Sequence, residues 1–294
     1  MKLITFEYEG KQQIGVLSED GRTIVRVCDV LGLPADLTMT EFIQRHGEDD
    51  LAALKKASEC AGTIETRAVR TLSPIPRPIH DVLCVGVNYA SHVEETRHGL
   101  KDQKFQRPEK SIYFGKRAVE IQGPDAEIQG RFDLDEEMDY EAELAVIIGR
   151  RCRDVAPEDT EECIFGYSVF NDLSSRKLQR LHKQWLRGKS LDGYTAMGPV
   201  ILTRDELPYP IEADVISRVN GEERQHSNTR LFLNDVPGIV SDLSMGMTLE
   251  PGDIIATGTP AGVAMGMDEP KWLKPGDVVE CEIPPIGVLR NRIR

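Results

Sequence analysis

The chain has 294 residues, of which 40% are hydrophobic and 29% are charged, and its formal net charge at pH 7 is −13. This length suffices for one large domain with a smaller companion, and the acidic balance argues against nucleic acid, whose phosphates would be repelled. No apolar run is long enough to cross a bilayer, and residues 1–9 are too short and too acidic for a signal peptide. The cytoplasm is therefore the expected location.

The six cysteines form no Cys-x-x-Cys pair and no Cys/His cluster with zinc spacing. A zinc site or a disulfide framework is therefore not expected. We interpret these cysteines as buried thiols: Cys28, Cys60, Cys84, Cys152, Cys163 and Cys281.

The first part of the chain predicts a small α+β unit. Residues 3–8, 12–17 and 23–27 have the pattern of short strands separated by turn sequences. Thr38 and Glu41 match the capping box that opens a helix. A second short helix is indicated by the helical spacing of Leu51, Leu54 and Ala57.

A proline-rich segment then suggests a domain boundary. Pro74, Pro76 and Pro78 stiffen a stretch that has little reason to be helix or strand. We place the boundary near residue 75, which gives a small N-terminal domain of residues 1–75 and a catalytic domain of residues 76–294.

The next segments predict a buried strand over residues 81–86 and a helix beginning near residue 91, with Ser91 as its cap. The polar stretch from residue 97 to residue 110 is typical of a mobile loop or lid, although a surface insertion without function has the same pattern.

Glu141 and Glu143 lead an unbroken apolar run, residues 144–148, which predicts a strand buried on both faces. Side chains two positions apart on a strand project to the same face, so both carboxylates face one spot. Burying two ionised carboxylates requires a compensating cation, either a metal ion or a cluster of Lys and Arg. The alternative is that the pair lies at an exposed strand end and is solvated.

Asp172 follows another predicted strand, residues 164–170, and strand exits are usual places for chemistry. Ser174 or Ser175 can cap a helix that follows. The apolar stripe of this helix is expected to consist of Leu178, Leu181 and Trp185. The last third of the chain is predicted to be β-rich, with strands over residues 214–219 and 278–283.

Five separated motifs together resemble the fumarylacetoacetate hydrolase family, in the order found in that family. They are Gly86-Val87-Asn88-Tyr89-Ala90-Ser91-His92, Glu141-Ala142-Glu143, Asn171-Asp172, Gly188-Lys189-Ser190-Leu191-Asp192-Gly193 and Thr257-Gly258-Thr259-Pro260-Ala261-Gly262-Val263. The resemblance runs from about residue 80 to the C-terminus.

The resemblance implies a mixed β-rich α+β fold, with a β-sandwich roll as the catalytic domain, assembled as a homodimer. It also implies a divalent metal, Mg²⁺ with Mn²⁺ or Ca²⁺ as substitutes, bound by Glu141, Glu143 and Asp172. Three acidic oxygens with open positions for water and substrate suit such a hard ion.

Catalytic roles also follow from the resemblance. Lys189 matches a lysine beside the metal, where its charge would stabilise a developing oxyanion. His92 and Glu95 match the His–Glu pair of family members that activate water, with Glu95 orienting the imidazole. Tyr140 and Ser190 are expected to be packing or supporting groups.

Four further residues are implied to contact the substrate. Arg176 and Gln179 match positions that do so in relatives, and both face the same side of the predicted helix. Gly258 and Thr259 lie in a glycine-rich loop whose amides can approach a carboxylate closely. One departure is Arg117, which stands where many relatives carry proline, so the pocket rim near Lys116 is expected to differ.

The leading hypothesis is a Mg²⁺-dependent hydrolase that cleaves a carbon–carbon bond in an acylpyruvate or another 2,4-dioxo acid through a stabilised enolate. Oxaloacetate decarboxylation, or enol/keto isomerisation of a 2-oxo acid, needs the same enolate, and fold and metal cannot separate these reactions. A non-catalytic metal-binding protein is the third possibility. The intact His92, Glu95 and Lys189 argue against it.

Overall fold

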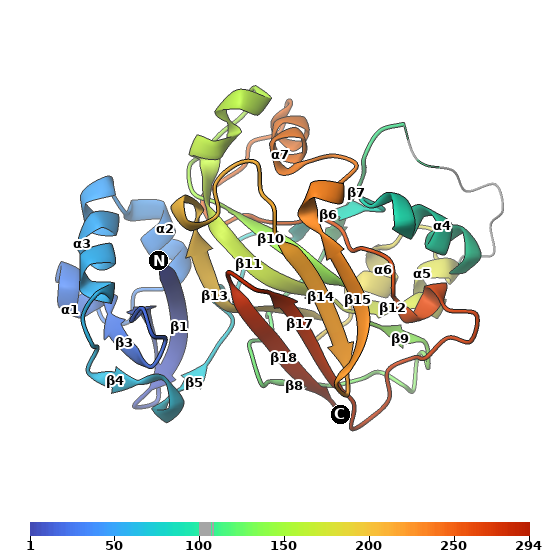
Figure 1. The fold of residues 1–294 in the computed structure, drawn as a ribbon, viewed down its shortest axis with the longest axis horizontal. Coiled ribbons are helices and arrows are strands. Elements are labelled where there is room, and N and C mark those ends of the chain that lie inside the picture. The colour runs from blue at the N-terminus through green and yellow to red at the C-terminus, as the bar shows by residue number, and fades with distance from the viewer. Residues whose placement is uncertain (100–106, 108) are drawn as a thin grey trace.

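Two β-sheets that pack on each other form the centre of the protein (Figure 1). This computed structural model describes residues 1–99, 107 and 109–294. Part of the predicted lid, residues 100–106 and 108, lies outside the described residues. Within the described part of the chain, no helix combines the length and apolar character needed to span a bilayer.

The N-terminal region contains five strands and three α-helices in the described residues. They are β1 (Lys2–Tyr8), β2 (Lys11–Leu17), β3 (Thr23–Arg26), α1 (Val27–Leu31), α2 (Met39–Arg45), α3 (Glu48–Ser58), β4 (Ile64–Glu65) and β5 (Arg70–Thr71). The strand and helix predictions for this region are confirmed. The capping box of Thr38 and Glu41 is also present at the start of α2.

The rest of the chain supplies most of the strands and the helices near the site. Its elements are β6 (Val82–Gly86), α4 (Ala90–Gly99), β7 (Ile112–Lys116), β8 (Glu127–Ile128), β9 (Met138–Asp139), β10 (Ala142–Ile148), β11 (Ile164–Asp172), β12 (Ser174–Ser175), α5 (Arg176–Leu181), α6 (Leu186–Lys189), β13 (Thr195–Thr203), β14 (Asp214–Val219), β15 (Glu222–Asn228), α7 (Val236–Ser244), β16 (Ile254–Ala256), β17 (Val278–Ile283) and β18 (Gly287–Ile293). Short 3₁₀ helices are η1 (Thr66–Ala68), η2 (Pro157–Cys163), η3 (Arg204–Glu206), η4 (Thr229–Leu231) and η5 (Ala264–Gly266).

The larger sheet has the strand order β4-β3-β2-β1-β13-β11-β10-β16-β6-β7, with β5 paired to β1, and the second sheet has the order β15-β14-β17-β18-β8. Strands β10 and β11 of the first sheet pack on β14, β17 and β18 of the second. The predicted sheet-rich, mixed class of fold is confirmed.

Strand β10 is buried on both faces, as its apolar run predicts. Leu144 and Val146 belong to the core between the sheets, whereas Ala145 and Ile147 belong to a second core that includes residues of the N-terminal region. Every residue of this strand is buried. A side chain leading β10 therefore has no access to bulk water unless a cavity supplies it.

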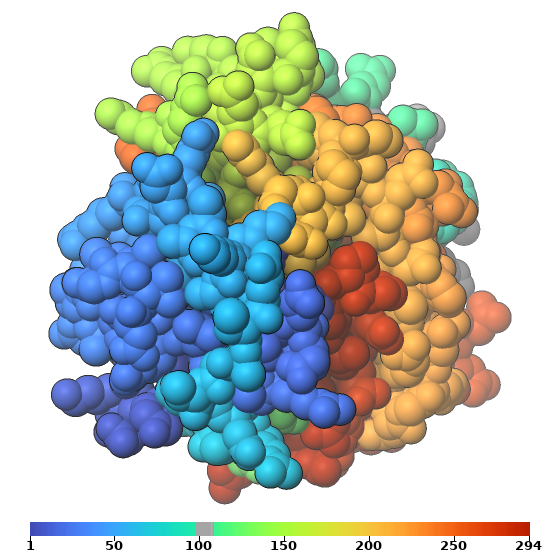
Figure 2. Space-filling view, turned by 60° about the vertical axis from the view of Figure 1, so that its left-hand side comes forward, coloured from blue at the N-terminus to red at the C-terminus, as the bar shows by residue number. Residues whose placement is uncertain are grey.

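The N-terminal region continues the larger sheet. Leu3 of β1 pairs with Ile201 of β13, and in Figure 2 the blue N-terminal segment lies directly against later segments of the chain. The segment with Pro74, Pro76 and Pro78 is neither helix nor strand, as predicted. The division into two domains near residue 75 stays a prediction.

Two local predictions about helices are wrong. Helix α4 begins at Ala90, so Ser91 lies inside the helix and does not cap it. Helix α5 ends at Leu181, which is 66% exposed, so Leu181 and Trp185 do not continue an apolar stripe from Leu178.

The start of α5 also differs from the prediction. Ser175 is the N-cap residue, but its side chain makes no capping hydrogen bond. The carboxylate of Asp135 instead accepts hydrogen bonds from the amides of Lys177 and Leu178, at 2.9 and 3.2 Å. A carboxylate from another segment thus satisfies the free amides of this helix.

Candidate active site

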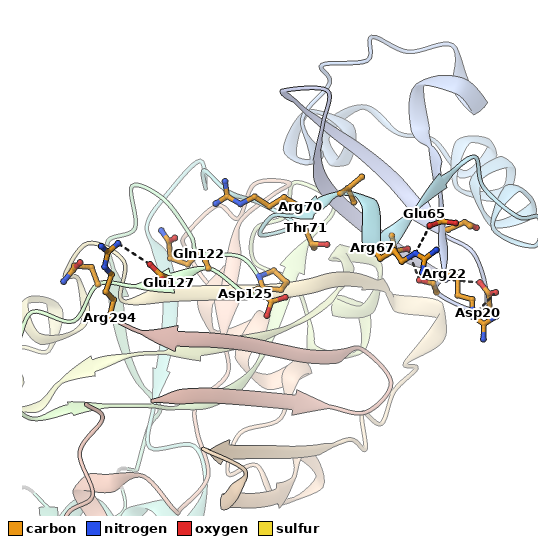
Figure 3. Close-up of a pocket in the computed structure, with 17 residues that line it drawn as sticks. Asp20, Arg22, Glu65, Arg67, Arg70, Thr71, Gln122, Asp125, Glu127 and Arg294 are labelled. Atoms are coloured by element: carbon orange, nitrogen blue, oxygen red, sulfur yellow. Dashed lines mark hydrogen bonds and ion pairs between the residues drawn. The ribbon is translucent and has the colours of Figure 1, made fainter. Parts of the chain in front are cut away.

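A small buried cavity contains most of the predicted site residues. Its volume is about 20 Å³, and its lining includes His92, Glu141, Arg176, Lys189 and Thr259. A cleft of about 1580 Å³ lies elsewhere, lined by residues of the N-terminal region and by the C-terminal Arg294 (Figure 3). Its arginines are exposed and none of the predicted site residues lines it, so we place the site at the small cavity.

Three carboxylates converge at the ends of β10 and β11. Glu141 directly precedes β10, Glu143 is its second residue and Asp172 is the last residue of β11. One oxygen from each lies within 4.8 Å of the others, and all three residues are buried. The amide of Asp172 donates to the carbonyl of Glu141 at 2.9 Å, which holds the two strand ends together. The alternative of a solvated strand end is wrong.

Two lysines and an arginine compensate this acidic cluster. The ammonium group of Lys189 lies 2.7 Å from oxygens of both Glu141 and Asp172. Lys116 lies 2.6 Å from the second oxygen of Asp172, and Arg176 lies 2.7 Å from the other oxygen of Glu141. The expected cluster of Lys and Arg therefore exists, and it leaves Glu143 as the carboxylate without an ion-pair partner among the described residues.

The pKa values in the cluster follow from this pairing. Burial raises the pKa of Glu141, but the charges of Lys189 and Arg176 outweigh burial and hold it well below its ordinary value. For Glu143, burial and the nearby carboxylates of Asp172 and Glu141 raise the pKa well above its ordinary value. Burial also lowers the pKa of Lys116. Glu143 is thus the group that most needs another positive charge.

The donor set fits a hard divalent ion. Glu143 accepts a hydrogen bond from the amide of Gly258 at 2.7 Å, which fixes its carboxylate beside Glu141 and Asp172. Carboxylate oxygens are the ligands that Mg²⁺ and Mn²⁺ prefer, and a divalent charge would compensate the third carboxylate. The assignment of these three residues as metal ligands stays a prediction.

His92 and Glu95 form a buried pair on α4. The imidazole Nδ1 lies 2.8 Å from a Glu95 oxygen, and the side chains are 6% and 10% exposed. The other oxygen of Glu95 accepts a hydrogen bond from the amide of Gly262 at 2.8 Å. Since the bond to Glu95 engages Nδ1, Nε2 of His92 is the ring atom left for chemistry.

The glycine-rich loop, residues 257–263, makes hydrogen bonds that support the site residues. The amide of Gly258 is engaged by Glu143, so it is not a free donor for a substrate carboxylate. Thr259 lines the cavity, but its hydroxyl donates to the carbonyl of Ala142 at 3.0 Å and accepts from Gln225. The structure therefore gives these two residues supporting contacts, and their predicted contacts with substrate remain untested.

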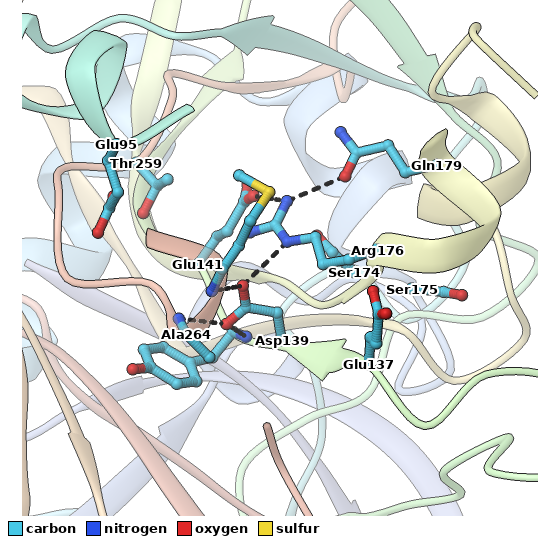
Figure 4. A network of polar contacts seen from close by, with 12 residues as sticks. Glu95, Glu137, Asp139, Glu141, Ser174, Ser175, Arg176, Gln179, Thr259 and Ala264 are labelled. Atoms are coloured by element: carbon cyan, nitrogen blue, oxygen red, sulfur yellow. Dashed lines mark hydrogen bonds and ion pairs between the residues drawn. The ribbon is translucent and has the colours of Figure 1, made fainter. Parts of the chain in front are cut away.

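Arg176 and Gln179 lie together as the helical spacing predicts, with Arg176 Nη1 3.1 Å from Gln179 Oε1 (Figure 4). Asp139 fixes the guanidinium from the other side, at 2.9 Å from Nε. The same carboxylate accepts hydrogen bonds from the amides of Ala264 and Met265, at 2.8 and 3.0 Å. Asp139 thus connects Arg176 to η5.

Sequence reasoning missed the roles of Asp139 and Lys116. Lys116 was expected at the pocket rim, but it is fully buried and donates to the carbonyl of Leu173 at 2.9 Å in addition to its ion pair. A charged residue at the end of an apolar strand was the available signal. The supporting roles expected for Tyr140 and Ser190 agree with their hydrogen bonds to Gly262 and Arg117.

Comparison with known proteins gives concordant results. The family model described as fumarylacetoacetate (FAA) hydrolase C-terminal matches residues 81–294. Oxaloacetate tautomerase YisK of Bacillus subtilis (strain 168) is 40% identical over 225 residues, which cover 76% of this chain and 73% of that protein.

Solved structures that cover 100% of this chain are also similar. Fumarylacetoacetate hydrolase (EaFAH) from psychrophilic Exiguobacterium antarcticum is 40% identical with a TM-score of 0.82, over 99% of its chain. Maleylpyruvate hydrolase from Sphingobium sp. SYK-6, in complex with manganese (II) ion and pyruvate, is 29% identical with a TM-score of 0.76, over 98% of its chain.

The fold and the site define a sheet-rich protein with a carboxylate–lysine centre beside a buried His–Glu pair. The chain belongs to the fumarylacetoacetate hydrolase family. The resemblance of its five motifs to this family is confirmed. Members of the family are enzymes, and its named relatives here include hydrolases and a tautomerase.

Proposed function

We propose that the protein is a divalent-metal-dependent enzyme that forms the enolate of a 2-oxo acid and hydrolyses a carbon–carbon bond in an acylpyruvate or another 2,4-dioxo acid. The observation that carries this proposal is that His92, Glu141 and Lys189 line one cavity. His92, which can transfer a proton, and Lys189, which can stabilise an anionic oxygen, thus face the same small cavity. A protein that only binds a metal has no need of a proton-transfer group.

Glu141, Glu143 and Asp172 would hold the ion, and Mg²⁺ is the proposed native metal. When bound, it would supply Lewis acidity that stabilises negative charge on the oxygen of the 2-oxo group. Manganese in the similar maleylpyruvate hydrolase supports a divalent metal of this kind.

The residues of the chain perform the remaining steps in this proposal. His92 accepts a proton from water, and Glu95 stabilises the resulting imidazolium. The water oxygen adds to the C4 carbonyl, the C3–C4 bond breaks and its electron pair stays on C3. Lys189 stabilises the enolate charge, and the imidazolium of His92 gives its proton to C3, which completes pyruvate and a carboxylic acid and regenerates the neutral imidazole. Arg176 and Gln179, which line the same cavity, are the proposed substrate contacts.

A second candidate is enol/keto tautomerisation of oxaloacetate or a related 2-oxo acid, or oxaloacetate decarboxylation. The similarity to oxaloacetate tautomerase YisK favours this reading. Here His92 would move a proton at C3 instead of activating water, and the carbon skeleton would stay intact in the tautomerisation. The same enolate serves both candidates.

We further infer a cytoplasmic homodimer that acts on a small-molecule 2-oxo acid, with residues 1–75 as a separate small domain. The homodimer is implied by the family resemblance alone. Size-exclusion chromatography with light scattering tests it, and a monomer at micromolar concentration would contradict it.

One experiment separates the reactions. Purified protein receives 2,4-dioxopentanoate and, separately, oxaloacetate, each with Mg²⁺ or with a chelator. Pyruvate and acetate from the first substrate support hydrolysis. Carbon dioxide from oxaloacetate without cleavage of the first favours decarboxylation, and an ultraviolet change from enol/keto exchange alone favours tautomerisation. Turnover that persists in chelator would contradict the metal-dependent proposal.

A further inference from the structure

Two buried polar groups beside the cavity have no hydrogen-bond partner among the described residues. They are the hydroxyl of Thr96 and Nη2 of Arg176. Thr96 is 3% exposed, Arg176 is 1% exposed, and both residues line the cavity. A buried donor without a partner costs free energy, so a site that holds two such donors is suited to a ligand that satisfies them.

Thr96 lies close to the proposed proton-transfer group. His92 and Thr96 are four residues apart on α4, so their side chains share one face of the helix. Thr96, His92 and Arg176 all line the same small cavity.

The guanidinium of Arg176 is held in place through two of its nitrogens, and the third, Nη2, has no hydrogen-bond partner among the described residues. Asp139 engages Nε, while Glu141 and Gln179 engage Nη1 at 2.7 and 3.1 Å. The two carboxylates balance the charge of the guanidinium. Nη2 therefore offers a directed N–H donor and little net charge, which suits a carbonyl or carboxylate oxygen.

We propose that Thr96 is a specificity-determining residue whose hydroxyl, together with Nη2 of Arg176, donates to an oxygen at C4 of the substrate. This inference rests on the proposed function. In that reaction the 2-oxo acid head lies at the carboxylate–lysine centre, and His92 acts next to C4. Thr96 lies one helical turn after His92 on α4, so its hydroxyl is the group expected next to the C4 oxygen.

The shared chemistry is a 2-oxo acid with an oxygen at C4. A 2,4-dioxo acid carries a ketone there, and oxaloacetate carries a carboxylate. Three ligands separate these sources: 2,4-dioxopentanoate, oxaloacetate and 2-oxopentanoate, which lacks the C4 oxygen. Trp185 lines the cavity, so tryptophan fluorescence in stopped-flow mixing reports binding before turnover.

The variants are Thr96→Val, which removes only the hydroxyl, and Thr96→Ser, which keeps it. On Mn²⁺-loaded protein, T96V should weaken binding of one or both C4-oxygen ligands about tenfold and leave 2-oxopentanoate within about twofold, as expected for one lost hydrogen bond. T96S should bind like the wild type. The ligand whose affinity falls in T96V shows whether Thr96 recognises the C4 ketone or the C4 carboxylate.

Equal weakening of all three ligands by T96V, or no weakening of any, would overturn the role of Thr96 while leaving the proposed function in place. If the wild type binds none of the three, the proposed function fails and this inference fails with it.

Thermal unfolding separates a specificity role from a structural one. In the ligand-free protein the Thr96 hydroxyl has no partner to lose among the described residues. T96V should therefore melt at the same temperature as the wild type or higher. A lower melting temperature would show that the hydroxyl supports the fold and would overturn the inference.

Discussion

The imidazole Nδ1 of His92 lies 2.8 Å from a carboxylate oxygen of Glu95, and the loop that carries Gly262 holds the other oxygen of this carboxylate. The pair is therefore anchored on both sides: by its own helix and by a segment 167 positions away along the chain. Such anchoring keeps the imidazole in one orientation, which a proton-transfer group requires.

Replacing His92 by Ala should lower kcat by about 10²- to 10⁴-fold, the usual contribution of a general base. Among the described residues, the hydrogen bond and ion pair of the His92 side chain go to Glu95 and not to the three proposed metal ligands, so affinity for Mn²⁺ should stay within about twofold of the wild type. Steady-state kinetics measure the fall in kcat, and a titration with Mn²⁺ measures the metal affinity. Loss of metal binding in H92A would instead make His92 a ligand or a support for the ligands.

Gly266 provides a second test of the same pair. A Cβ atom at this position would lie 1.6 Å from Cγ of Glu95, so Gly266→Ala must displace Glu95. We expect a fall in kcat of about tenfold or more with metal affinity retained. Gly115→Ala is the matched control, because its added methyl group meets no described atom within 4 Å. Equal activity of the two variants would contradict the role of Glu95.

Lys189 should stabilise the metal-free protein. Its ammonium group lies 2.7 Å from both Glu141 and Asp172, so Lys189→Met removes one of the two ion-pair partners that each of these buried carboxylates has among the described residues. Breaking a buried pair costs about 3–5 kcal/mol of unfolding free energy, and saturating Mg²⁺ should restore part of this loss. Chemical denaturation with and without the ion measures both effects.

The control for this experiment is Lys55→Met. Lys55 is 54% exposed and pairs with Asp205 on the surface, so its loss should change stability little. If K189M is no less stable than K55M, the carboxylates are compensated by other means and the proposed role of Lys189 fails.

Local features of the sequence predict the part of the site that depends on local geometry. The two-residue spacing of Glu141 and Glu143 places both on one face of a strand, and the three-residue spacing of His92 and Glu95 places them side by side on a helix. The buried character of β10 follows from its apolar run. Asp172 needed the family resemblance, because only strand pairing brings β11 beside β10.

The missed features depend on long-range contacts. The amide that Asp139 binds at Ala264 is 125 positions away, and no local pattern encodes it. The predicted helical stripe past Leu178 failed because Lys183 adopts a left-handed backbone with φ of 59°, and the chain turns there. Trp185 then packs against Phe114 at 5.2 Å between ring centroids instead of extending α5.

Metal affinity should rise with pH. Burial and the neighbouring carboxylates raise the pKa of Glu143 above the ordinary value of 4.5, so the metal-free folded protein keeps a proton there that the unfolded chain has lost. This proton favours folding at low pH, and the benefit is lost as pH rises toward the folded-state pKa. A divalent ion must displace the proton in order to bind.

Calorimetric titration of Mn²⁺ at about pH 6 and about pH 8, in two buffers of different ionisation enthalpy, measures affinity and proton release together. Tighter binding at the higher pH, with up to about one proton released per ion, is expected. Glu143→Gln should abolish the proton release and lower the affinity for Mn²⁺. Affinity that is independent of pH would show that Glu143 is already ionised.

Asp139→Asn should weaken substrate binding more than it slows turnover. Asp139 does not line the cavity, but it accepts hydrogen bonds from Nε of Arg176 and from two amides of η5, and it is fully buried. An amide in its place removes the charge that holds the guanidinium, so Arg176 should lose its fixed orientation. We expect KM to rise about tenfold while kcat changes less, because the His92–Glu95 pair does not involve Arg176 and Glu141 keeps its ion pair with Lys189. Asp139→Glu, which keeps the charge, should recover part of the affinity if orientation of Arg176 is the cause. A fall in kcat with unchanged KM, and no recovery in the Glu variant, would show that Asp139 acts on the fold or on the chemistry and not through Arg176.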